Sequence, residues 1–160
     1  MALALVSAAK IVLPALYDGY AKHEQIIMAA KQCETSLSKA EELLAMEEKL
    51  QNKTTVVETA RMSVEACVRN LHKYLEKMSI ATKEDNADVS ESKSMVGKAM
   101  DFGAKVVSKV ADATKTRIES LLVDRVAQLS RHNSDLLIAC VDLSLAIQRI
   151  PQKSSFCTIS

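Results

Sequence analysis

The sequence predicts an all-α protein, an antiparallel bundle of four or five long amphipathic helices with a short flexible C-terminal tail. The 160 residues include only 3 glycines and 2 prolines, which leaves few of the residues that hairpins and tight turns require. Apolar residues make up 48% and charged residues 26%, as in an ordinary globular chain. Apolar side chains also recur every three or four residues. We therefore expect one bundle domain over residues 1–151 and a tail over residues 152–160.

The first long helix is predicted between Leu16 and Leu50. Ser38 and Glu41 have the spacing of a capping box, which leaves an interruption near them open. Residues 51–54 are expected to form the turn that follows. The apolar stripe of this helix comprises Ile26, Ala30, Cys33, Leu37, Ala40 and Leu44.

The second helix is predicted to begin with a capping box formed by Thr55 and Glu58. Its regular three-four spacing is typical of a coiled-coil seam, so the helix must pack against other helices. Residues 82–93 are almost entirely polar and are predicted to form a surface loop. The stripe that precedes this loop comprises Val57, Ala60, Val64, Cys67, Leu71, Tyr74 and Met78.

Helical spacing resumes at residue 94 and is expected to continue to Leu129, with Thr116 and Glu119 forming either a further cap or a coincidental pair inside that helix. Residues 131–135 predict a break, after which Asn133 or Ser134 would cap a last helix. A fusion of the third and last helices through a kink is the alternative.

The last helix is apolar over most of its circumference, and a helix of this kind is normally the buried one. Pro151 is expected to end it. Its main stripe comprises Leu136, Cys140, Leu143, Ile147 and Ile150, broadened by Leu137, Val141 and Leu145.

The N-terminal residues 1–16 resemble a signal peptide in hydrophobicity, but they have no basic start and are interrupted by Lys10 and Pro14. They are also shorter than the roughly 20 apolar residues of a membrane-spanning helix. Three of the four cysteines lie on apolar helical faces and lack the spacing of metal ligands, so they are predicted to be buried thiols in a reducing compartment. These cysteines are Cys33, Cys67 and Cys140.

No pattern in the sequence indicates catalysis, a cofactor or a metal. His23, His72 and His132 are scattered and lack the spacing of metal ligands. No nucleophile elbow or phosphate-binding loop is present. With 0 tryptophans, 2 phenylalanines and a net charge of +1, the chain offers neither the stacking residues nor the field that nucleic acid requires. We therefore expect a protein that is not an enzyme and does not bind nucleic acid.

The C-terminal tail carries a candidate prenylation box, which is the strongest functional signal in the sequence. Cys157 is fourth from the end, Ile159 provides the aliphatic position, and Ser160 is a terminal residue that farnesyltransferase reads. Thr158 completes the recognised segment. The sequence therefore predicts lipid attachment at Cys157, with an unmodified tail as the alternative.

One lipid chain binds membranes only weakly, so a stable anchor requires a second signal. Residues 93–160 carry 10 basic and 6 acidic side chains, whereas residues 1–92 carry 11 and 14. Four lysines on the predicted third helix could contact anionic lipid, although they could equally form an ordinary solvated face. These lysines are Lys98, Lys105, Lys109 and Lys115. Alternatively, the N-terminal helix could lie in the membrane interface rather than in the core.

Three functions follow from these observations. The first is a prenyl-anchored interaction or scaffold module, cytoplasmic and peripheral on a membrane, that binds a protein partner or itself through its helices. The second is a membrane-perturbing bundle of the cell-death type, which rests on fold-level analogy alone. The third, with no supporting residues, is a small enzyme or ligand carrier that uses a cavity in the bundle.

Overall fold

The computed structural model describes residues 2–99 and 104–150, with side chains described for residues 2–82, 116, 117 and 119–150. The described residues form four α-helices and no strand, so the predicted all-α bundle of long helices is confirmed. The predicted flexible tail, residues 152–160, lies outside the described residues. The helices are α1 (Ala2–Gly19), α2 (Glu24–Glu48), α3 (Thr55–Ala99) and α4 (Ala104–Gln148).

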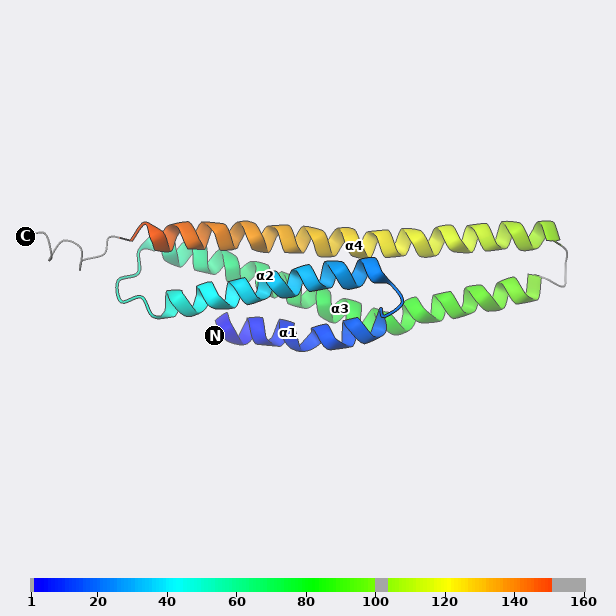
Figure 1. Cartoon of the computed structure of the whole chain (residues 1–160), viewed down its shortest axis with the longest axis horizontal. Coiled ribbons are helices and arrows are strands. Elements are labelled where there is room, and N and C mark those ends of the chain that lie inside the picture. Colours follow the sequence, from blue (N-terminus) through cyan, green and yellow to red (C-terminus); the bar gives the residue numbers. More distant parts are fainter. Residues whose placement is uncertain (1, 100–103, 151–160) are drawn as a thin grey trace, which may run out of the picture.

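The four helices form two hairpins that pack side by side (Figure 1). Two contacts show that α1 and α2 are antiparallel. Lys10 pairs with Glu41, whereas Tyr17, later in α1, donates to Glu34, earlier in α2. α3 and α4 are likewise antiparallel, and they extend beyond the ends of α1 and α2 (Figure 1). Each hairpin therefore brings together helices that are neighbours in the sequence, as expected for short connections.

Between the hairpins, the neighbouring helices run parallel. Cys33 Sγ donates to the Leu129 carbonyl oxygen at 3.6 Å, and the Ser36 hydroxyl donates to Asn133 Oδ1, so α2 and α4 run in the same direction. α1 packs against α3 in the same way, whereas α2 and α3 touch only briefly. Each helix therefore has two main neighbours, and none is surrounded on all sides.

A single apolar core runs between the four helices, and it contains the predicted stripes of α2 and α3 almost completely. Alanine, leucine and valine predominate, which allows close approach of the helices and regular packing. The largest fully buried side chains are Leu13, Leu16, Tyr20, Ile26, Leu37, Leu44, Leu71, Leu75, Met78, Leu129, Leu136 and Leu143.

The predicted helix between Leu16 and Leu50 is instead two helices, because the chain reverses direction after Gly19. The backbone N–H of His23 donates to the Tyr20 carbonyl oxygen at 2.8 Å, and the Tyr20 side chain is buried. A Cβ at Gly19 would lie 2.5 Å from Thr82 Cγ2 on α3, so the close approach requires glycine there. A single glycine inside an apolar pattern does not by itself predict a reversal, which explains the error.

The helix caps also differ from the prediction. α2 passes through Ser38 and Glu41 without interruption, so these residues do not form a cap. α3 begins after Thr54, whose hydroxyl oxygen accepts a hydrogen bond from the Val57 backbone N–H at 3.2 Å. The predicted cap at Thr55 is therefore wrong by one residue, although the turn before α3 is correct.

Two predicted breaks are helical in the structure, because α3 continues through residues 82–93 and α4 continues through residues 131–135. Neither segment contains glycine or proline, and a polar segment can remain helical where a helix is solvated. Asn133 contacts Ser36 on α2 instead of capping a helix. From Ala104 onward the third and last predicted helices are one helix, α4, which ends before Pro151 as predicted, whereas residues 94–99 of the third predicted helix belong to α3.

Candidate functional site

The predicted lipidation residues Cys157, Thr158, Ile159 and Ser160 lie outside the described residues. The predicted basic stripe does not lie on one helix. Lys98 is on α3, whereas the other three lysines, Lys105, Lys109 and Lys115, are on α4, because the chain changes helix between Ala99 and Ala104. Their side chains are also outside the described set, so the lipid-contact role remains a prediction.

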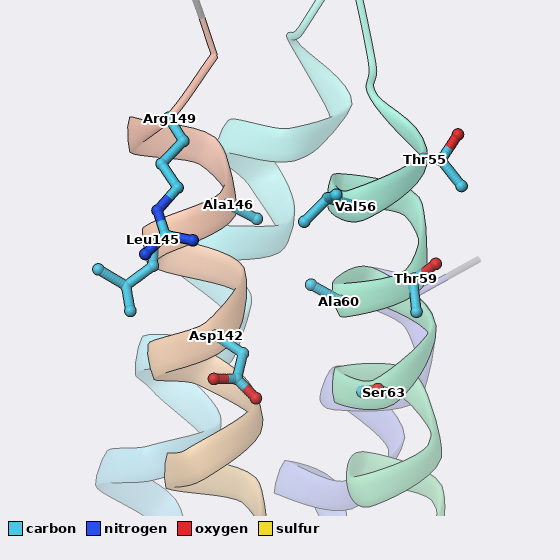
Figure 2. Close-up of a pocket in the computed structure, with 9 residues that line it drawn as sticks. All are labelled: Thr55, Val56, Thr59, Ala60, Ser63, Asp142, Leu145, Ala146 and Arg149. Atoms are coloured by element: carbon cyan, nitrogen blue, oxygen red, sulfur yellow. The ribbon is translucent and has the colours of Figure 1, made fainter.

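An open groove of about 510 Å³ lies between the N-terminal turns of α3 and the C-terminal turns of α4 (Figure 2). Val56 and Ala60 point toward α4, and Ala146 points toward α3 (Figure 2). The short side chains of Ala60 and Ala146 leave the space between the helices unfilled. We call this feature the α3–α4 groove; it is lined by Thr55, Val56, Thr59, Ala60, Ser63, Asp142, Leu145, Ala146 and Arg149.

The α3–α4 groove combines an apolar lining with two opposite charges. Val56, Ala60 and Leu145 give it an apolar lining, while Asp142 and Arg149 place one negative and one positive charge on the α4 wall. The lining contains no thiol, imidazole or second carboxylate that could form a nucleophile and base with its hydroxyl groups. An apolar segment that also carries charge would match this lining.

Beside the groove, α4 exposes large apolar side chains, although this helix was predicted to be buried around most of its circumference. The prediction is wrong for this face, because α4 occupies a corner of the bundle and only one side of it reaches the core. The buried side includes Leu136, Cys140 and Leu143. The exposed side, which we call the apolar stripe of α4, comprises Leu137 (39% exposed), Ile138 (63%), Val141 (55%) and Leu145 (43%).

A smaller polar pocket of about 200 Å³ lies farther along α3 and α4, lined by Cys67, Asn70, Gln128, Arg131, His132 and Asp135. The Cys67 thiol donates to the Asp135 carbonyl oxygen at 3.6 Å. Burial raises the pKa of Cys67, and the Asp135 charge raises it further. The thiol is therefore protonated at neutral pH and is not an activated nucleophile, despite the nearby imidazole of His132.

We expect the free energy of unfolding to fall more steeply between about pH 7 and pH 5 in the wild type than in His132→Gln. Burial lowers the pKa of His132 below its usual 6.5; Arg131 acts in the same direction and Asp135 opposes it. Below about pH 6.5 the unfolded chain therefore takes up a proton that the folded protein does not, and acid favours unfolding. Urea denaturation at several pH values measures the free energy of unfolding of both proteins. If it fell equally with decreasing pH in the wild type and in His132→Gln, the prediction would be contradicted.

Cys33 and Cys140 are buried, as predicted, whereas Cys67 is only half-buried. Burial raises the pKa of Cys33 to about 12 and that of Cys140 to about 11. The histidines take up local structural contacts: His72 Nε2 lies 3.1 Å from Glu76 Oε1, and the His132 ring lies 5.1 Å from that of Tyr74. Among the residues that the structure describes, no three metal-binding side chains gather in one place.

Among the described helices, α1 is the one whose length and composition would allow it to cross a membrane. This is weak evidence, because core helices and signal sequences have the same composition. α1 contributes Val6, Leu13 and Leu16 to the core, while Ile11 on its outer face is exposed. Lys10 and Pro14, which interrupt the apolar run of the sequence, both lie inside this helix.

The sequence did not predict the α3–α4 groove. Ala60 and Ala146 belong to the core pattern, and only their positions on neighbouring helices create the space between them. No protein-family model, curated protein or solved structure matches this chain.

Proposed function

We propose that this protein is a non-enzymatic interaction module that a farnesyl group on Cys157 holds at a cytosolic membrane face. The proposal takes Ser160 as the carboxyl terminus, so that Cys157, Ile159 and Ser160 form the farnesylation box. The Cys157 thiol loses its proton to solvent, its sulfur bonds to C1 of farnesyl diphosphate, and diphosphate leaves as the carbon–oxygen bond breaks. The bundle then recruits a protein partner to the membrane.

The observation that carries the interaction role is the apolar stripe of α4. Ile138, Val141 and Leu145 follow one another at spacings of three and four residues, the pattern that an amphipathic helix of a partner would match. Complete burial of a fully exposed side chain of this kind contributes about 1.5–3 kcal/mol. These three side chains are 43–63% exposed, so covering each of them contributes roughly half of that. Contiguous exposed apolar patches, in contrast to single exposed apolar residues, mark interaction sites in many proteins.

The lipid anchor is tested by the intact mass of protein made in a eukaryotic cell, together with flotation on phosphatidylserine-containing liposomes. We expect the wild type to lose Thr158, Ile159 and Ser160 after farnesylation, to gain a methyl ester, and to float with the liposomes. Cys157→Ser should stay unmodified and soluble with an unchanged melting temperature, whereas Cys67→Ser, the control thiol, should still float. An unmodified wild-type mass would overturn the anchor.

The interaction surface is tested with the fluorescent apolar probe anilinonaphthalene sulfonate. Binding should fall in Ile138→Ser/Val141→Ser, because this variant removes the centre of the apolar stripe. Val123→Ser is the matched control, because Val123 is 63% exposed on the same helix and lies outside the stripe. Equal binding by both variants would show that the stripe is not a distinct apolar surface.

A second candidate is a membrane-perturbing bundle, which the apolar composition of α1 favours. Insertion would require α1 to leave the core. This would remove Leu13 and Leu16 from the core and break the ion pair between Lys10 and Glu41. Dye release from anionic vesicles distinguishes the candidates. The interaction module leaves the vesicles intact, while a perturbing bundle releases the dye and loses this activity in Ile11→Asp.

A further inference from the structure

The α3–α4 groove opens where the chain leaves the bundle. Arg149 lines the groove, and residues 151–160 begin two positions after it. We propose that in the unlipidated protein residues 151–160 fold back into the α3–α4 groove and place Phe156 against its apolar lining. This inference deepens the proposed function, and its regulatory meaning rests on that function, because the tail carries the lipidation site.

The tail is long enough to reach the whole groove. From Arg149 to Asp142 the groove follows seven residues of α4, a length of about 10 Å at 1.5 Å per residue. Ten residues in extended conformation span up to about 33 Å. The tail can therefore turn after Pro151 and still place Phe156 beside Val56 or Leu145, at an effective concentration on the order of millimolar.

The composition of the tail matches the lining of the groove. Phe156 and Ile159 are its large apolar side chains, and Lys153 is its charged side chain. The groove offers an apolar lining around Val56 and the negative charge of Asp142. Its volume of about 510 Å³ falls within the range of about 300–1,000 Å³ in which proteins bind peptide-sized or drug-sized groups.

A docked tail has two consequences. It covers Leu145, the last residue of the apolar stripe of α4, and it holds Cys157 away from a transferase that requires an extended, accessible terminus. Release of the tail exposes the Leu145 end of the stripe together with the cysteine. Lipid attachment would therefore be coupled to partner binding, because the farnesylated tail is drawn to the membrane.

Alkylation of Cys157 by iodoacetamide, followed by mass spectrometry, tests the docking in unlipidated, bacterially expressed full-length protein. We expect Cys157 to react at least about tenfold more slowly than in a free peptide of residues 151–160, corresponding to about 1.4 kcal/mol of docking free energy. Val56→Asp or Phe156→Ser should restore the rate of the free peptide. Val123→Asp, an equally exposed position outside the groove, should not change the wild-type rate.

A wild-type rate equal to that of the free peptide would overturn the proposal, as would protection that survives Val56→Asp in a folded variant. Melting temperatures show whether each variant is folded. Phe156 lies outside the four helices, so Phe156→Ser still tests the docking if Val56→Asp unfolds the protein. Neither lipid nor partner is present in this experiment. Failure here therefore leaves the farnesyl anchor intact, and an unmodified mass from eukaryotic cells leaves the docking intact.

Discussion

Alanine in place of Leu143 should lower the free energy of unfolding by about 2–5 kcal/mol. Leu143 is fully buried on the core side of α4, so the change removes apolar contacts and leaves a cavity that the surrounding helices fill only in part. Urea denaturation monitored by circular dichroism measures the loss.

Leu145→Ala is the matched control, because it makes the same chemical change two residues away on the same helix. Leu145 is 43% exposed, so we expect a clearly smaller loss, of about 1 kcal/mol or less. The same variant should weaken the binding of the apolar probe to the stripe. Comparable losses of stability in the Leu143 and Leu145 variants would mean that the apolar stripe of α4 is part of the core. The proposal that the stripe is an interaction surface would then be wrong.

Replacing Lys53 and Arg61 together by methionine should destabilise the protein by about 3–5 kcal/mol. Glu47, near the C-terminal end of α2, is the one buried charged side chain among those described, with 1% of its surface exposed. Its Oε1 lies 3.1 Å from Lys53 Nζ and 3.3 Å from Arg61 Nε. The double variant would leave this carboxylate buried without a compensating charge, which is the costly arrangement.

The control for this network is the triple variant, in which Glu47→Leu is added to the two methionines. It removes the buried charge together with its partners, so most of the lost stability should return. Lys53→Met alone should cost less, because Arg61 remains beside the carboxylate. A triple variant as unstable as the double one would show that the loss arises from packing and not from the buried charge.

The sequence predicted the parts of the fold that repeat along the chain. The stripes of α2 and α3 are in the core, from Ile26 to Leu44 and from Val57 to Met78, because helical periodicity directly reflects which face avoids water. The close approach of Gly19 to Thr82, by contrast, joins residues more than sixty positions apart in the sequence. Local signals cannot report such a contact.

The two wrong breaks have a related cause. Residues 82–93 and 131–135 are rich in residues that favour turns and caps, but these residues are also tolerated in a helix that has a partner. For residues 131–135 this partner includes α3, because the Cys67 thiol donates to the Asp135 carbonyl oxygen. Asn133, which was expected to cap a helix, instead contacts Ser36 on α2.

The candidate site divides in the same way. The sequence by itself predicted the farnesylation box around Cys157, and it determined the apolar character of α4. Both depend only on residue types and their order. The sequence also placed Leu143 on the main apolar stripe and Leu145 on its broadened edge. The tertiary structure decided that this edge is exposed beside a groove, because α4 occupies a corner of the bundle and only its inner face meets the other helices. The apolar pattern indicates which side of the helix faces the core, but how much of a wide apolar face is covered depends on how many neighbouring helices pack against it.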